Sequence, residues 1–126
     1  MSEEFDLDEM RSSLDGLALE LLGGMFPGVD VEAYYRAAEE YVEGCLERDP
    51  DYRRFAEGGG PVEGLVYTSM EKVASAYVLI TGRRDRERVE RVLKNYEVMV
   101  GDDMEAEGLL TRVMGYVLRK KAGGRC

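Results

Sequence analysis

The stretch PVEGLVYTSMEKVASAYVLITG, residues 61–82, has the pattern that recurs along the whole chain. It opens with Pro61, which suits the first turn of a helix, and it closes with Gly82, a residue typical of helix C-termini. The spacing of its apolar and small residues is that of an amphipathic helix, so we predict a helix over residues 61–81. Its predicted inner face consists of Val62, Leu65, Val66, Ser69, Val73, Ala76, Tyr77 and Ile80.

The residues before this stretch predict three more helices. The first runs from its N-cap Asp6 to the pair Gly23-Gly24, and the second runs from its N-cap Asp30 to about Asp49. A short helix follows over residues 50–56, and the three glycines after it predict a hinge at 58–60. The apolar stripes of the two long helices are Met10, Leu14, Leu17 and Leu21, and then Val31, Tyr34, Tyr35, Ala38, Tyr41, Val42, Cys45 and Leu46.

Two further helices are predicted after Gly82. A turn over residues 83–85 leads to a helix that ends at Gly101, and the capping box Asp102/Glu105 starts a last helix before a frayed tail at 122–126. Since the connections are short, consecutive helices should pack as antiparallel neighbours. The sequence therefore predicts one domain over residues 1–126, an all-α compact antiparallel bundle of about five long helices and one short helix, with no sheet. Its predicted core includes Leu17, Leu21, Val42, Leu65, Val73, Val92, Leu110 and Val117.

The composition excludes several kinds of chemistry. The chain has 126 residues and no histidine, so Ser-His-Asp and Cys-His nucleophiles and His-ligated metal sites are absent. An enzyme built on this chain would have to use carboxylates, Tyr, Lys, Arg or Cys. Because no catalytic or cofactor-binding motif stands out, we predict no enzymatic activity, no catalytic residues and no cofactor.

Composition also bears on compartment and source. The chain has no apolar run near the roughly 18 residues of a membrane span, and its first residues are acidic, unlike a signal peptide, so we expect a cytoplasmic protein with no membrane partner. Cys45 is expected to be a buried, inert thiol, while a disulfide between Cys45 and Cys126 and a cross-link of two chains through Cys126 in air stay open as alternatives. The single Asn and absent Gln favour a thermophilic source, while the 13 Arg against 4 Lys fit this or a GC-rich genome.

Charge is distributed unevenly along the chain. Residues 1–51 hold 15 acidic and 3 basic side chains, residues 52–82 hold 3 of each, and residues 83–126 hold 8 acidic and 11 basic ones. The second predicted helix carries an acidic flank at i, i+4 spacing, formed by Glu39, Glu43 and Glu47. The helix after residue 85 is predicted to carry a basic flank formed by Arg84, Arg88 and Arg91.

This polarity predicts a protein that works by binding another protein. An acidic end and a basic end allow the chain to bind itself, so we predict an adaptor, regulatory or structural subunit that forms a homodimer. The acidic flank of one surface would meet the basic flank of another, and Tyr34 or Tyr35 together with Met99 would supply the apolar contacts.

Two other functions stay open at this point. Glu40 and Glu43 form a Glu-x-x-Glu pair that resembles the all-α nucleotide pyrophosphohydrolases. That resemblance implies Mg²⁺ held against a phosphate by this pair and a second acidic pair on a neighbouring helix. In its place residues 61–82 offer Glu63 and Glu71, eight residues apart. The second alternative is a protein linked to nucleic acid, which binds RNA through the basic helix or mimics a polyanion with the acidic half.

Overall fold

The computed structural model describes residues 7–58, 60–104 and 107–122. Within these ranges the chain is helical and has no strand, so the all-α prediction is confirmed. The helices are α1 (Leu7–Met25), α2 (Val31–Leu46), α3 (Pro50–Gly58), α4 (Pro61–Thr81), α5 (Arg86–Met104) and α6 (Glu107–Ala122).

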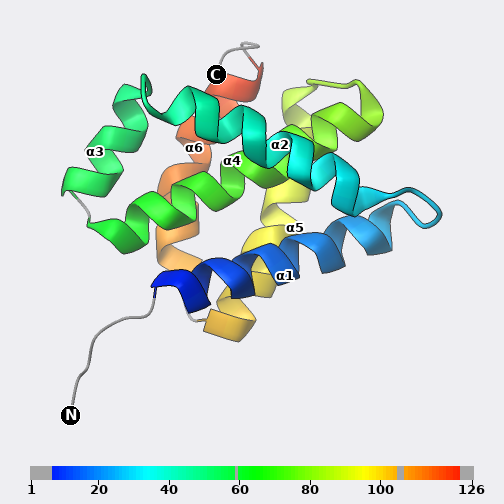
Figure 1. The fold of residues 1–126 in the computed structure, drawn as a ribbon, viewed down its shortest axis with the longest axis horizontal. Helices are drawn as coiled ribbons and strands as arrows, with labels where there is room; N and C mark the ends of the chain where they lie inside the picture. The colour runs from blue at the N-terminus through cyan, green and yellow to red at the C-terminus, as the bar shows by residue number, and fades with distance from the viewer. Residues whose placement is uncertain (1–6, 59, 105–106, 123–126) are drawn as a thin grey trace.

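Helix α4 lies at the centre of the bundle and contacts each of the other five helices. In Figure 1, α1 and α2 run in opposite directions beside α4, while α5 and α6 form a second antiparallel pair that crosses behind them. The short helix α3 packs against α4 near its N-terminus. Because neighbours cover α4 on every side, it is buried all round from Glu63 to Tyr77, and not only on the inner face that its spacing predicts.

Two predicted helix ends are confirmed by their capping geometry. The Asp30 carboxylate accepts a hydrogen bond from the backbone N–H of Ala33 at 3.2 Å, as an N-cap does. Gly82 ends α4 in the left-handed conformation, with φ of 70°, and its N–H donates to the carbonyl of Val78 at 2.7 Å. A residue with a side chain would be strained there, which is why glycine suits this position.

Two other predicted ends are wrong. Gly23 and Gly24 lie inside α1, which continues to Met25, and Gly101 lies inside α5, which continues to Met104. A glycine inside a helix costs only about 1 kcal/mol relative to alanine, and the packing of α1 and α5 outweighs that cost. The capping box predicted at Asp102 is wrong as well, because Asp102 lies inside α5. Outside the described residues lie the predicted cap Asp6, the capping-box partner Glu105, the middle of the hinge at residue 59 and the tail after residue 122.

The core confirms six of the predicted positions and corrects two. Leu17 and Leu21 are only partly buried, because the inward face of α1 continues from Leu14 to Ala18 and Leu22. Its leucines occur on both sides of the predicted stripe, so spacing alone does not decide which side packs, and Ala18 is small enough to allow close contact. The buried face of α1 is Met10, Leu14, Ala18 and Leu22, and the confirmed positions are Val42, Leu65, Val73, Val92, Leu110 and Val117.

The contact between α3 and α4 depends on a glycine. A Cβ atom at Gly64 would lie 3.1 Å from the Cβ and 3.2 Å from the Cα of Ala56, closer than ordinary packing allows. We expect Gly64→Ala to lower the free energy of unfolding by about 1–3 kcal/mol, because the two helices must separate. Gly115 is the matched control: nothing lies within 4 Å of its Cβ position on α6, so Gly115→Ala should stabilise by about 0.5–1 kcal/mol. Urea unfolding of both variants checks this, and equal effects of the two substitutions would contradict it.

Candidate functional site

The predicted acidic flank is divided between an internal ion pair and the surface. Glu39 is partly buried and accepts a hydrogen bond from Lys72 Nζ at 3.0 Å, and Lys72 itself is only 3% exposed. Partial burial opposes ionisation of Glu39, but the hydrogen bond and charge of Lys72, with those of Arg36, outweigh it and lower the pKa of Glu39. Glu43 and Glu47 are exposed. Glu39 therefore holds α2 to α4 in this structure.

The predicted basic flank is divided as well. Arg84 lies in the turn before α5 and not on that helix. Arg88 pairs with Asp85 at 3.5 Å, and Arg91 pairs with Glu87 at 3.9 Å, so acids close in sequence offset both charges. Among the described residues Arg84 forms no ion pair.

The two adjacent tyrosines have opposite environments. Tyr34 is 38% exposed, which leaves it available for an interface. Tyr35 is fully buried and donates its hydroxyl hydrogen bond to Asp15 on α1. Burial, reinforced by that hydrogen bond and by the charge of Asp15, raises the pKa of Tyr35 well above its usual range. The prediction of Tyr35 as an interaction residue is therefore wrong, since successive helix residues point about 100° apart.

The carboxylates of the possible Mg²⁺ site are placed as follows. Glu40 and Glu43 are exposed on α2. Glu63 pairs with Arg112 at 3.1 Å, and Glu71 pairs with Lys121 at 3.3 Å, so both acids of α4 face a cation. Within the described ranges, no group of three or more potential ligands gathers in a way that would hold a metal.

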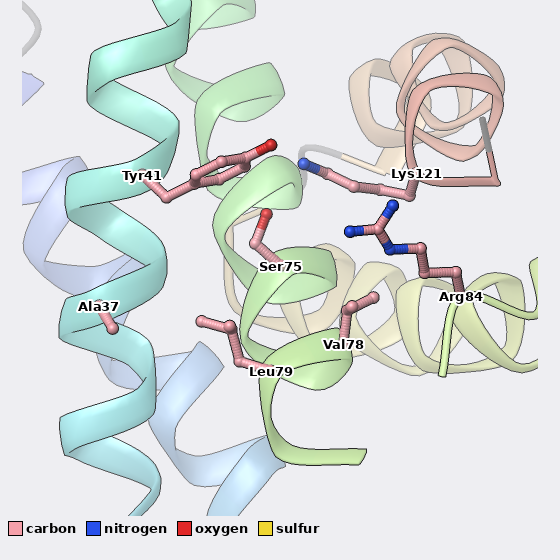
Figure 2. A pocket seen from close by; sticks show the side chains of 7 residues that line it. All are labelled: Ala37, Tyr41, Ser75, Val78, Leu79, Arg84 and Lys121. Atoms are coloured by element: carbon pink, nitrogen blue, oxygen red, sulfur yellow. The ribbon is translucent and has the colours of Figure 1, made fainter. Parts of the chain in front are cut away.

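A hollow opens between α2, α4, the turn before α5 and the end of α6, and we call it the α2–α4 hollow. Its volume is about 250 Å³. Figure 2 shows its walls, with Tyr41 on one side, Leu79 below and Arg84 and Lys121 on the other side. Tyr41 and Leu79 are large and unusually exposed, at 48% and 47%. The lining consists of Ala37, Tyr41, Ser75, Val78, Leu79, Arg84 and Lys121.

Three polar groups converge on this hollow (Figure 2). The Ser75 hydroxyl is buried, the residue being 5% exposed, and it has no hydrogen-bond partner in the described part of the chain. Lys121 Nζ lies 5.4 Å from the centre of the Tyr41 ring, a cation–π distance. The guanidinium of Arg84 points into the same space from the side on which Lys121 lies, opposite Tyr41.

Glu71 pairs with Lys121 and offsets part of the positive charge around the hollow. Its Oε1 is 3.3 Å from Lys121 Nζ, an ion-pair distance, but the geometry is not that of a hydrogen bond. Burial raises the pKa of Glu71, and the charges of Lys121 and Lys120 counteract that rise only in part. With Glu71 ionised, the two cations and one carboxylate leave a net charge of +1 around the hollow.

Neither Ser75 nor Lys121 is predicted from the sequence to be a site residue. Lys121 belongs to a basic run that is typical of an exposed helix C-terminus, and Ser75 is a short polar residue between alanines. One signal does point toward them, because Glu71 and Lys72 interrupt a long apolar stretch where a purely structural helix needs no charge. Such residues require partners from other helices when they are buried.

Cys45 also differs from its prediction. It is 8% exposed, but it is disulfide-bonded and not an inert thiol. Cys126, the second cysteine in both disulfide alternatives, lies outside the described residues.

Comparison of the chain with protein-family models, with curated proteins and with solved structures finds no match. In the described part of the chain, none of the helices combines the length and the apolar character needed to cross a bilayer.

Proposed function

We propose that this chain is a protein–protein interaction module that forms a homodimer through the face around the α2–α4 hollow. The observation that carries the proposal is the exposure of three large side chains. Tyr41 and Leu79 line the hollow and are 48% and 47% exposed, and Tyr34, two turns before Tyr41 on α2, is 38% exposed. Tyrosines around an apolar hollow are typical anchors of protein interfaces. This site replaces the charged flanks as the proposed contact, since Glu39, Arg88 and Arg91 have partners within the chain.

The two sides of α2 support this choice. On the side that faces α1, the helix is acidic. Glu39 pairs with Lys72 there, and Glu43 lines another surface hollow together with Lys72 and Arg11. On the side of the α2–α4 hollow, its exposed residues are uncharged over three turns. At helical spacing these residues form one strip, which consists of Tyr34, Ala37, Tyr41 and Gly44. An uncharged exposed strip in a chain with 34% charged residues favours contact with a partner.

A second copy of the chain fits this face by charge. Exposed Glu40 lies beside the strip on α2, and Arg84 lies on the opposite wall of the hollow. A two-fold axis through the hollow would bring Glu40 of each copy toward Arg84 of the other, and the same patch would then serve both copies. A cytoplasmic location and a thermophilic source remain part of the proposal. The ion pairs that α6 makes with Asp49, between α2 and α3, and with Glu71 of α4 suit high temperature and support a thermophilic source.

We do not extend the proposal to the two other functions. Both acids of α4 that would complete a Mg²⁺ site face cations, and Arg88, Arg91 and Lys94 on α5 each pair with an acid one turn away. No observation on this structure favours a phosphate or nucleic-acid ligand over a protein.

The dimer can be tested by placing a charge on its proposed face. We expect Leu79→Glu to raise the dimer dissociation constant at least about tenfold, because a carboxylate would be desolvated in an apolar contact. Val98→Glu is the matched control, since Val98 is 58% exposed on α5 and does not line the hollow. Both variants add the same charge. Sedimentation velocity at low salt therefore distinguishes the effect of where the charge is placed from the effect of the changed net charge. A wild type that stays monomeric at high concentration, or equal effects of the two variants, would overturn the dimer.

A further inference from the structure

We infer that the α2–α4 hollow binds a small organic monoanion, namely a carboxylate attached to a short apolar body. This goes beyond the proposed dimer and does not depend on it, because every residue involved belongs to one chain. The inference stands on the hollow itself, a buried unpartnered hydroxyl, two converging cations and an apolar wall.

The Ser75 hydroxyl is the most specific of these features. Buried polar groups in proteins nearly always have a hydrogen-bond partner, so an exception needs a reason. Two other hydroxyls on α4 bond back to the helix, Thr68 to the carbonyl of Gly64 at 2.9 Å and Thr81 to that of Tyr77 at 2.8 Å. Ser75 makes no such bond and lines the hollow. Its free donor suits a ligand oxygen.

Charge then selects the class of ligand. Lys121 and Arg84 contribute two positive charges, and the neighbouring Glu71 contributes one negative charge. The net charge of +1 matches a monoanion such as a carboxylate, whereas a dianionic phosphate would leave uncompensated charge beside Glu71. A carboxylate can accept from a guanidinium, an ammonium and a hydroxyl together, which are the three groups that meet here (Figure 2).

The rest of the hollow limits the size and polarity of the ligand. Its other walls are Ala37, Val78, Leu79 and the ring of Tyr41. The volume of about 250 Å³ lies just below the range of pockets that take drug-sized molecules, so the body of the ligand should be a chain or ring of a few carbon atoms. Hexanoate has a carboxylate and an apolar chain of suitable length, and it serves as the probe.

The test is an NMR titration of the full chain with three probes. Hexanoate should shift the amide resonances of Ser75, Val78 and Leu79 in a saturable way. Hexanol has the same apolar chain without the charge, and inorganic phosphate has charge without the chain, so both should bind about tenfold more weakly or not at all. Equal affinity for hexanoate and hexanol would overturn the claim that the ligand is an anion. Equal affinity for hexanoate and phosphate would overturn the claim that the ligand has an apolar body.

Two variants locate the binding groups without disturbing the bundle. Arg84→Gln should weaken hexanoate about tenfold, whereas Arg83→Gln, its exposed neighbour outside the lining, should not. Ser75→Ala should weaken hexanoate severalfold while leaving the melting temperature equal or higher, because it removes an unpartnered buried hydroxyl. Unchanged hexanoate binding in both Arg84→Gln and Ser75→Ala would overturn the site.

Hexanoate binding and dimer formation are distinguished by working at a protein concentration at which the chain is monomeric. Sedimentation in each sample shows which state is present, and the binding measurement is made where the chain is monomeric. Saturable binding to the monomer supports the monoanion site whether or not a dimer forms at higher concentration. Absence of hexanoate shifts in a monomeric sample overturns the site and leaves the dimer proposal intact.

Discussion

Replacing Asp49 with alanine is expected to lower the free energy of unfolding by about 3–5 kcal/mol. Asp49 is only 3% exposed, and it lies between α2 and α3 at a meeting point of three parts of the chain. Its carboxylate pairs with Lys120 of α6 and accepts a hydrogen bond from the hydroxyl of Tyr67 on α4 at 3.1 Å. Loss of this carboxylate would leave a buried ammonium and a buried hydroxyl without that partner.

The same side chain also starts α3. Asp49 Oδ1 accepts from the backbone N–H groups of Asp51 at 2.9 Å and Tyr52 at 3.3 Å, which are free donors of the first helical turn. Asp49→Asn keeps an oxygen for this cap but loses the charge, so its loss of stability should be smaller than that of Asp49→Ala. The two variants therefore divide the effect between the helix cap and the ion pair with Lys120.

Urea unfolding followed by circular dichroism measures these changes. Glu57→Ala, an exposed acid on α3, is the control and should change stability by no more than about 0.5 kcal/mol. The double variant Asp49→Ala/Lys120→Met should recover part of the loss, because it removes the uncompensated charge. If Asp49→Ala unfolds at the same urea concentration as Glu57→Ala, the buried ion pair contributes nothing and this account of the core is wrong.

Leu14→Ala is expected to cost about 2–5 kcal/mol, which is the range for a buried leucine whose removal leaves a cavity. Leu14 is 1% exposed and lies on the face of α1 that packs inward, and its carbonyl accepts the hydroxyl of Tyr96 at 3.0 Å. That hydrogen bond uses the backbone carbonyl and survives the substitution, so the loss of free energy of unfolding measures the side-chain packing alone.

Leu17→Ala is the internal comparison on the same helix. Leu17 is only partly buried, so its truncation should cost about 1 kcal/mol. Thermal or urea unfolding of the pair measures which face of α1 points inward. A larger loss for Leu17→Ala than for Leu14→Ala would place Leu17 in the core and contradict the packing described here.

Local features of the sequence were sufficient to predict where the helices lie. The N-cap of Asp30, the left-handed stop at Gly82 and the prolines at the starts of α3 and α4 act within about one turn, so short-range patterns predict them. Gly23, Gly24 and Gly101 mark the limit of this reasoning, because each lies inside a helix whose packing outweighs a weak local preference. The charged flanks were also visible in the sequence, but their partners were not.

Only the tertiary structure decided which polar residues are buried and which of them meet. Lys120 and Lys121 have the pattern of an exposed helix end, yet they lie against Asp49 and Glu71, which are far away in the sequence. In the same way, Ser75, Arg84 and Lys121 come together from α4, a turn and α6. Helix formation depends on residues three or four positions apart, whereas burying a charge or forming a hollow depends on which side chains other helices supply. The sequence by itself therefore determined an all-α chain and its helices, and the packing around α4 decided the ionic core and the candidate site.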